Sequence, residues 1–465
     1  MEEIKNPIRI TPEEAEELIA EKKFSLLRES LREMNPADIA EFFESVKMEY
    51  SPILYRILPK GIAAEVFVEM DSDFQQTLIS AFNDYELRQM LDELFLDDTV
   101  DIIEEMPANV VSRILRNSTP EARRTINELL QYPEDSAGGI MTTEYVSLKQ
   151  HMTVDEAFDL IRRVAIDKET IYTCYVTNAN RQLIGIVTAK TLMISPRDAK
   201  LEEIMEQNVI SVQTHTDKEE VGQMFSKYGF LALPVVDTED RIVGIITVDD
   251  AIEVIHEEAD EDFAVMAAIT PSETTYLKTS AFSIFLARIP WLMILMLSAT
   301  LTGIIISGFE NALSACVALT AFIPMLMGTG GNSGSQSSVT VIRGLSLGEI
   351  EFRDTLRVIW KEIRVALLCS VCLMAVSYAK IYLVDYLLMG TLTSSEALLV
   401  PLVVCITLGI TVFAAKLIGC ILPIVAKKLG ADPAVMASPF ITTLVDAISL
   451  ACYFAVAILI IPGLA

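Results

Sequence analysis

The chain has 465 residues, a formal net charge of −28 at pH 7 and a hydrophobic content of 52%. This acidic balance leaves no basic surface for phosphate and argues against a nucleic acid partner; three histidines argue against a zinc site. Clustered carboxylates instead suit hard cations, which prefer oxygen ligands, although acidity also increases solubility.

The charge is divided unevenly along the chain. Residues 281–465 contain nine acids and ten bases, a net of +1, whereas residues 1–280 hold the other 55 acids and 26 bases, a net of −29. We therefore expect an acidic, water-exposed first part and a nearly neutral membrane part. The opening "MEEIKNPIRI" lacks the basic and apolar regions of a signal peptide, so we expect no cleaved leader. The seven cysteines show no metal-ligand or disulfide pattern.

Residues 1–131 have helical periodicity and few glycines, which predicts an acidic helical N-domain. The segments "MNPADIAEFFESV", "LPKGIAAEVFVEM" and "LFLDDTVDIIEEM" look like copies of one short helical unit. Such units stack into a superhelix around a shared core. The stretch "YPEDSAGGI" (132–140) has the turn residues of a linker.

Residues 141–255 contain an internal repeat. "CYVTNANRQLIGIVTAKTL" is echoed by "LPVVDTEDRIVGIITVDDAI", and each copy predicts strand, helix, strand, turn, strand, helix. The repeat resembles a tandem pair of α/β CBS domains, at 132–200 and 201–252, a module that senses small ligands and dimerises. Adenine nucleotides are common ligands of such pairs, so ATP stays open as a ligand. Tyr172 and Tyr175 could stack on an adenine or belong to the core.

A connecting helix, residues 249–272, joins the repeat to the membrane part. At about 100° per residue its carboxylates gather on one face: Asp250, Glu253, Glu257 and Glu261, flanked by Glu258 and Asp262. Apolar residues occupy the opposite face: Ile252, Ile255, Ala259, Phe263 and Met266. Two carboxylates about 4 Å apart repel by about 4 kcal/mol at an effective dielectric constant of 20, and a divalent cation between them reverses the sign. The alternative is a solvated acidic face; the position beside the membrane part favours a cation-operated switch.

Apolar stretches predict five membrane spans, each long enough to cross a bilayer: Phe282–Ile306, Ala312–Gly334, Val365–Leu388, Leu398–Ile424 and Ala434–Ile460. Loops 307–311 and 384–397 lack Lys and Arg, whereas residues 341–364 carry five such bases and residues 426–433 carry two. Lys278 and Arg288 flank the first span. The positive-inside rule therefore puts the basic loops and the soluble domains in the cytoplasm, and the C-terminus outside.

Two motifs mark the membrane part. "PMLMGTGGNSGSQSSVTVIRG" (324–344) is rich in small residues, which permit close helix packing. "SPFITTLVDAISLACYF" (438–454) carries Asp446 in its middle. An acid inside a span costs at least about 2.5 kcal/mol and is usually functional. The alternative is a buried acid paired with a base.

With these motifs, the order of parts resembles the MgtE family of magnesium channels over essentially the whole chain: a helical N-domain, a CBS pair, a connecting (plug) helix and, at 273–465, a transmembrane domain of five helices. The resemblance implies a homodimer in the plasma membrane with its pore on the two-fold axis, lined by the second and fifth spans. It implies that Asp446 binds Mg²⁺ there and that Asn332 contributes nearby. Amide packing is the alternative for Asn332.

The resemblance also implies feedback, in which cytosolic Mg²⁺ bound between the N-domain, CBS pair and plug helix holds the gate shut. The positions that match are Glu65, Asp97, Asp101, Asp217, Glu219, Asp250, Glu253, Glu258, Glu261 and Asp262. One position departs: "KYGFLALP" has Gly229 where some relatives have an acid, which leaves one inter-domain ion site and the Mg²⁺ sensitivity open.

Two other functions are weighed against a channel. A coupled carrier for divalent cations would use Asp446 equally well, but the spans show no inverted repeat. A membrane-tethered nucleotide sensor would need neither membrane motif. An enzyme is not expected, because the sequence shows no nucleophile–base constellation and no P-loop. Selectivity over Mn²⁺, Co²⁺ or Ca²⁺ does not follow from the sequence.

Overall fold

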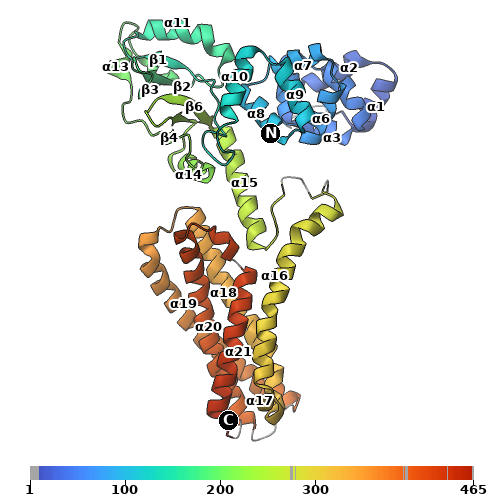
Figure 1. Ribbon diagram of the computed structural model, residues 1–465, viewed down its shortest axis with the longest axis vertical. Coiled ribbons are helices and arrows are strands. Elements are labelled where there is room, and N and C mark those ends of the chain that lie inside the picture. Colours follow the sequence, from blue (N-terminus) through green and yellow to red (C-terminus); the bar gives the residue numbers. More distant parts are fainter. Residues whose placement is uncertain are drawn as a thin grey trace, which may run out of the picture. The chain divides into compact units, whose positions relative to one another are not determined.

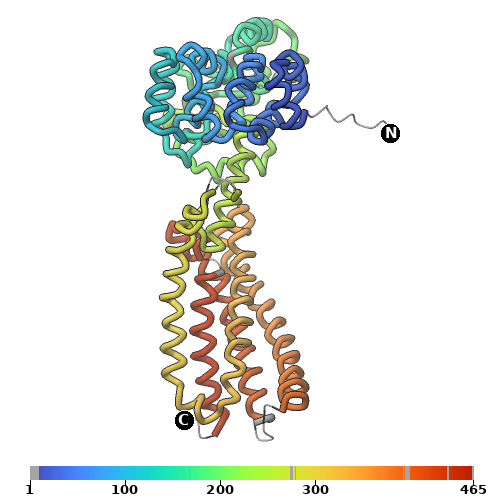
Figure 2. The backbone as a smooth tube through the Cα atoms, turned by 90° about the vertical axis from the view of Figure 1, so that its right-hand side faces the viewer, coloured from blue at the N-terminus to red at the C-terminus, as the bar shows by residue number. Residues whose placement is uncertain are grey.

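The computed structural model describes residues 10–272, 276–277, 279–390, 392, 396–436 and 438–462. The chain divides into two compact units, Met1–Ile255 and His256–Ala465, and its path is drawn in Figures 1 and 2. Lys278 and part of the loop 384–397, both used above for orientation, lie outside the described residues.

The first part of the chain is a helical superhelix, as predicted. Its helices are α1 Pro12–Ala20, α2 Phe24–Arg32, α3 Pro36–Ser45, α4 Ser51–Ile57, α5 Lys60–Val68, α6 Ser72–Ala81, α7 Asp84–Leu91, α8 Leu96–Glu105, α9 Ala108–Asn117 and α10 Pro120–Leu129. Local chemistry sets many starts: Thr11 and Asn83 form capping boxes, and proline occupies the first turn of α1, α3 and α10. Alternate helices then pack in two rows: α3 on α5, α5 on α7 and α7 on α9, and α4 on α6, α6 on α8 and α8 on α10. This packing buries one continuous core.

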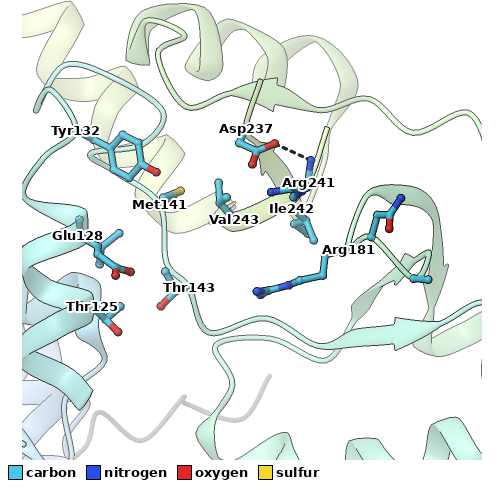
Figure 3. Close-up of a pocket in the computed structure, with 13 residues that line it drawn as sticks. Thr125, Glu128, Tyr132, Met141, Thr143, Arg181, Asp237, Arg241, Ile242 and Val243 are labelled. Carbon is cyan, nitrogen blue, oxygen red and sulfur yellow. Dashed lines mark hydrogen bonds between the residues drawn. The ribbon is translucent and has the colours of Figure 1, made fainter. Parts of the chain in front are cut away.

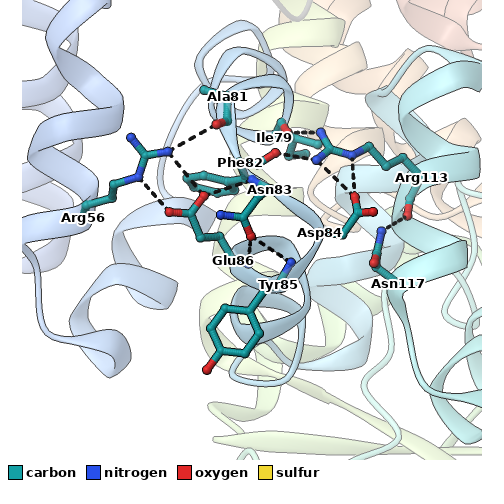
Figure 4. A network of polar contacts seen from close by, with 10 residues as sticks. All are labelled: Arg56, Ile79, Ala81, Phe82, Asn83, Asp84, Tyr85, Glu86, Arg113 and Asn117. Atoms are coloured by element: carbon teal, nitrogen blue, oxygen red, sulfur yellow. Dashed lines mark hydrogen bonds and ion pairs between the residues drawn. The ribbon is translucent and has the colours of Figure 1, made fainter.

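Two arginines tie neighbouring helices of the superhelix together (Figure 4). Arg56 on α4 donates to the carbonyl oxygen of Ala81 at 3.3 Å. Arg113 on α9 donates to the carbonyl oxygens of Ile79 and Phe82. The last carbonyls of a helix have no partner within it, and cations there also suit the helix dipole. The end of α6 is therefore capped from two other helices.

The internal repeat forms two three-stranded sheets with the same order and pairing. The first copy contains β1 Ser147–Lys149, α11 Val154–Val164, β2 Thr173–Thr177, β3 Leu183–Thr188 and α12 Ala189–Ile194. After α13 Leu201–Ile204, the second contains β4 Val212–Gln213, α14 Lys218–Tyr228, β5 Ala232–Val236, β6 Ile242–Thr247 and α15 Val248–Met266. In each sheet the first pair of strands is parallel and the second antiparallel. The element order predicted for each copy is confirmed.

The stretch predicted as a linker is packed rather than free. The backbone N–H of Ala137 donates to Thr216 O at 2.7 Å, and Thr142 N–H donates to Ile245 O at 2.8 Å. A Cβ added to Gly138 would lie 2.9 Å from Thr214 O. Residues 136–142 are therefore held against the second sheet, which fixes the end of the superhelix to the CBS pair.

The second unit is a bundle of long helices that lie side by side (Figures 1 and 2). They are α16 Ala281–Gly308, α18 Ile323–Ser346, α19 Thr355–Lys380, α20 Glu396–Lys428 and α21 Ser438–Ile460, with the short α17 Glu310–Ala315. A π-helical stretch, Ile381–Leu388, extends α19. Four of the described segments are long and apolar enough to cross a membrane: Ala281–Gly308, Phe352–Leu388, Leu398–Lys428 and Pro433–Ile460.

The predicted second span, 312–334, needs correction. The chain leaves helical geometry at Cys316, where φ is −139° and ψ is 84°, and a 3₁₀ turn over Val317–Phe322 follows. The continuous helix is α18, shifted toward the C-terminus, and its Gly, Ser and Thr residues make it less apolar than the other four. It packs against α20 and α21, so this second span is defined by packing rather than by hydropathy.

Glycines set the close approach of α18 to α20. A Cβ on Gly334 would lie 3.2 Å from Ala415 O, and one on Gly419 would overlap the carbonyl oxygen of Gly334. Small residues that let helix backbones touch are a common device of membrane bundles. The small residues of the first membrane motif thus have a structural role on this face of α18.

Candidate functional site

The opposite face of α18 carries an exposed polar stripe. Exposed residues recur about every four positions, at Gly328, Asn332, Gln336, Thr340 and Arg343, and Val339 beside them is exposed as well. The other face is buried against α20 and α21, with Gly330, Gly334, Ser337 and Val341 among its residues. Polar groups exposed at membrane depth need water or a protein partner, because lipid cannot hydrogen-bond them. The stripe is therefore suited to a hydrated surface.

Asp446, the predicted pore acid, lies on α21 beside this helix. α21 packs on α18: a Cβ on Gly331 would touch Thr442 at 3.0 Å, one turn before Asp446. Asp446 is half-buried and Asn332 is exposed. Carboxylate, amide and hydroxyl oxygens are the donors that suit a hydrated Mg²⁺ ion. Two neighbouring helices thus supply both residues predicted from the membrane motifs.

A cluster of carboxylates in the first unit carries strong electrostatic strain. Asp97 lies on the first turn of α8, and its Oδ1 is buried without a hydrogen-bond partner in the described part of the chain. Burial, followed by the charge of Asp250 on α15, raises the pKa of Asp97 to about 6. Burial, followed by Asp97 and Asp250, raises the pKa of Asp98 to about 7. Asp250 itself accepts a hydrogen bond from the Thr247 hydroxyl at 2.6 Å.

The cluster includes two carboxylates that the sequence did not single out. Asp98 adjoins Asp97 in "LDDTVD", so the acidic motif that pointed to Asp97 also contains Asp98. Glu169, just before β2, had no such signal, yet burial followed by Asp97 and Asp250 raises its pKa to about 8. Asp101 lies one turn further along α8 and is open to solvent on one side. Desolvation by the surrounding helices, followed by the charges of Asp97 and Asp98, raises its pKa.

These carboxylates are spread rather than collapsed into a cage. No group of three or more His, Cys, Asp or Glu side chains within the described ranges is arranged to hold a metal ion. Their oxygen donors nevertheless fit a hard divalent cation. Bound positive charge would relieve the repulsion that raises the pKa values.

The C-terminal end of the connecting helix α15 contacts α18 directly. The Ser346 hydroxyl, on the last residue of α18, donates to Asp262 Oδ2 at 2.8 Å. Burial, offset in part by this hydrogen bond, raises the pKa of Asp262. Val265 and Met266 of α15 pack near Ile342 of α18. The C-terminal part of α15 and the end of α18 are therefore in direct contact.

The apolar face predicted for the connecting helix is largely unburied. Ile252, Ile255 and Phe263 are exposed, whereas Ala251 and Val254 are buried. The helix thus turns a different face to its own domain than periodicity alone indicates. An exposed apolar surface of this kind is typical of an interaction site.

The other predicted regulatory residues have more ordinary surroundings. Asp217 caps α14, and its Oδ1 accepts the N–H of Glu219 at 2.9 Å. Glu219 in turn accepts from the Gln223 side chain at 3.2 Å. Glu65, Glu253 and Glu261 are exposed, and Glu258 is half-buried.

The backbone conformation explains why a glycine stands at the position that departs from the family pattern. Gly229 ends α14 in the left-handed conformation, with φ of 65°. This conformation favours glycine strongly over residues with a Cβ. An acid at this position would carry backbone strain.

A separate polar hollow of about 460 Å³ lies between α10, the packed linker and the two hairpin turns of the CBS pair (Figure 3). The guanidinium of Arg181 points into it. Its carboxylates are engaged elsewhere: Asp237 Oδ1 accepts two backbone N–H groups at 2.8 and 2.9 Å, and Glu128 pairs with Arg124 at 2.9 Å. The hollow is therefore unsuited to a cation.

The two tyrosines proposed for nucleotide stacking have different surroundings. Tyr175 is fully buried in the core, and Tyr172 is 67% exposed. Burial removes Tyr175 from any nucleotide surface, because its ring faces are covered by protein. Tyr172 keeps the exposure that stacking requires.

Comparisons with known proteins cover all parts of the chain. Family profiles match residues 323–456 (MgtE, divalent cation transporter), 34–135 (MgtE intracellular N domain) and 137–196 and 201–257 (CBS domain). The magnesium transporter MgtE of Thermus thermophilus is 37% identical over 96% of this chain and 98% of the relative. That of Bacillus subtilis is 33% identical over 96% of each.

Among solved structures, the cytosolic domain of the Mg²⁺ channel MgtE in complex with ATP is similar to the first part of the chain. It has a TM-score of 0.50 and 36% identity, and the match covers 52% of this chain and 99% of that one. The likeness extends over both the helical superhelix and the CBS pair.

Proposed function

The chain belongs to the MgtE family of divalent cation transporters, and from this membership we propose that it is an Mg²⁺-selective channel that cytosolic Mg²⁺ closes. It is a membrane protein of magnesium transport, not an enzyme, with a cytosolic N-domain and CBS pair.

The observation that carries the proposal is the polar stripe on α18, the helix against which α21 packs with Asp446. One chain leaves this surface exposed, and a second copy facing it would enclose a hydrated path between two stripes. We propose that such a homodimer forms, with Asp446 of each chain and Asn332 contacting hydrated Mg²⁺. The exposed apolar residues of α15 support a second copy as partner. The C-terminus then lies outside the cell.

The strain in the acidic cluster supports feedback by Mg²⁺. At low Mg²⁺, repulsion among Asp97, Asp98 and Asp250 favours separation of α8 from α15; bound Mg²⁺ favours their approach. α15 also contacts the end of α18 through Asp262, so its position bears on the path. Glu65, Asp101, Asp217, Glu219, Glu253, Glu258 and Glu261 are proposed as further ligands of regulatory Mg²⁺.

ATP is proposed as a ligand of the CBS pair. A similar cytosolic domain was solved with ATP, and Tyr172 is exposed. Isothermal titration with ATP should give binding that weakens in Tyr172→Ala. Unchanged affinity would remove Tyr172 from the site, and no heat with the native chain would remove ATP.

The decisive experiment is Mg²⁺ influx into liposomes that carry the purified chain. Asp446→Ala should abolish influx or its selectivity, because the path loses its carboxylates. Asp385→Asn is the matched control, since Asp385 pairs with Lys380 at 2.8 Å on α19 and its extension; it should conduct as the native chain does. Native influx with an indistinguishable Asp446→Ala would contradict the pore assignment.

The second candidate function is a coupled carrier for divalent cations, for which Asp446 would serve equally. Single-channel recording in a planar bilayer separates the two. Resolved unitary Mg²⁺ currents support a channel, whereas influx without such currents and dependent on a second ion gradient supports a carrier.

A further inference from the structure

A lysine is buried inside the transmembrane bundle. Lys416 on α20 is 5% exposed, within a segment long and apolar enough to cross the membrane. Charged side chains inside membrane spans are costly and mark functional positions by default. In the Lys380–Asp385 pair, by contrast, the lysine side chain is 44% exposed and the aspartate side chain 13% exposed.

The lysine belongs to a chain of three polar groups from three helices. The Lys416 ammonium donates to Ser337 Oγ on α18 at 3.3 Å. The Ser337 hydroxyl donates to Glu362 Oε2 on α19 at 2.7 Å. Ser337 is 2% exposed. A buried ammonium and a half-buried carboxylate thus compensate each other through one hydroxyl, which lowers the cost of both.

This network fixes the rotation of α18. Ser337 lies on the buried face of the helix, next in sequence to Gln336 on the exposed stripe. The close approach of Gly334 and Gly419 holds α18 near α20 but involves no side-chain hydrogen bond. The hydrogen bonds at Ser337 resist rotation of the helix, because they are directional.

We propose that Lys416, Ser337 and Glu362 form a positioning network that holds Asn332 and Gln336 toward the ion path and thereby sets cation selectivity. The proposal rests on the function proposed above. These three residues do not contact the permeating ion; they act through the orientation of α18. A misplacement of path-lining oxygens by a fraction of an ångström changes how well they match a hydrated ion, and Mg²⁺ is stringent in this respect.

The test compares Mg²⁺ and Ca²⁺ influx into liposomes for the native chain, Lys416→Met, Glu362→Gln, the double variant and Ser337→Ala. Each single variant should change the ratio of Mg²⁺ to Ca²⁺ influx by about threefold or more, because it breaks the network. The double variant, which removes both charges and the bond from residue 416 to Ser337, should also depart from the native ratio. Lys380→Met, which removes the ammonium of the other ion pair, is the control and should keep the native ratio.

The ratio separates positioning from mere stability, since fewer folded channels lower both fluxes together. Single variants with lower flux but the native ratio would overturn the proposal, as would a double variant with the native ratio. If Lys416→Met and Glu362→Gln yield no folded protein, Ser337→Ala and the double variant decide, and a native ratio in Ser337→Ala refutes it. A native chain that carries neither cation would defeat the proposed function itself.

Discussion

Removal of one charge from the acidic cluster should stabilise the Mg²⁺-free protein. The substitution is Asp97→Asn, which keeps the shape of the side chain and removes its charge. Folding raises the pKa of Asp97 from 3.8 to about 6, and at about 1.36 kcal/mol per unit this corresponds to about 3 kcal/mol. The folded state binds more protons than the unfolded state, so the penalty is absent below pH 3.8 and complete above about pH 6.

The expected gain is therefore pH-dependent. At pH 8 without Mg²⁺, the amides of α8 in Asp97→Asn should be up to about 100-fold more protected from hydrogen exchange than in the native chain. At pH 5 the gain should fall to about half in free energy, because the native carboxyl is then mostly protonated. Millimolar Mg²⁺ should increase protection in the native chain and narrow the difference.

Hydrogen exchange by mass spectrometry on the full chain is the suitable assay, since Trp291 and Trp360 both lie in the second unit and would not report on α8. Asp73→Asn is the control, because Asp73 is an exposed residue on the first turn of α6. Equal protection of native and Asp97→Asn at both pH values, or no response of the native chain to Mg²⁺, would refute the reasoning.

Two further substitutions test the packing on which the function depends. Gly419→Ala should lower the thermal midpoint in detergent, at a cost of about 1–3 kcal/mol or more, because the new methyl overlaps the carbonyl of Gly334. The control Gly303→Ala, which has open space around it, should leave the midpoint unchanged. An unchanged midpoint in Gly419→Ala would contradict the close approach of α18 and α20. Arg113→Met should cost about 1–3 kcal/mol and expose the amides at the end of α6 to hydrogen exchange, because it removes the cap on the carbonyls of Ile79 and Phe82; unchanged exchange there would show that water replaces the arginine.

The element types and their order could be read from the sequence because the signals are local. The capping boxes at Thr11 and Asn83 and the early prolines mark helix starts within a few residues. The repeat at 141–255 predicted two copies of one sheet, and both formed. The second span was misplaced because Cys316 gives no local sign that helical geometry ends there.

The sequence predicted individual residues of the candidate site but not the contacts that position them. Asp446 stands out because one acid in an apolar run is conspicuous wherever the run folds. Lys416 lies in an equally apolar run, but the sequence around it does not indicate that it joins Ser337 and Glu362 in one hydrogen-bonded chain.

Local patterns predicted most of the helices, strands and spans and which of them carry acids. Packing alone brings Asp97, Glu169 and Asp250 into one electrostatic environment and turns the glycines of α18 inward and its polar stripe outward. The physical reason is range: capping and periodicity act within one or two turns of chain, whereas desolvation and charge coupling depend on distance in space. Residues some 80 or 150 positions apart become neighbours only when the helices pack.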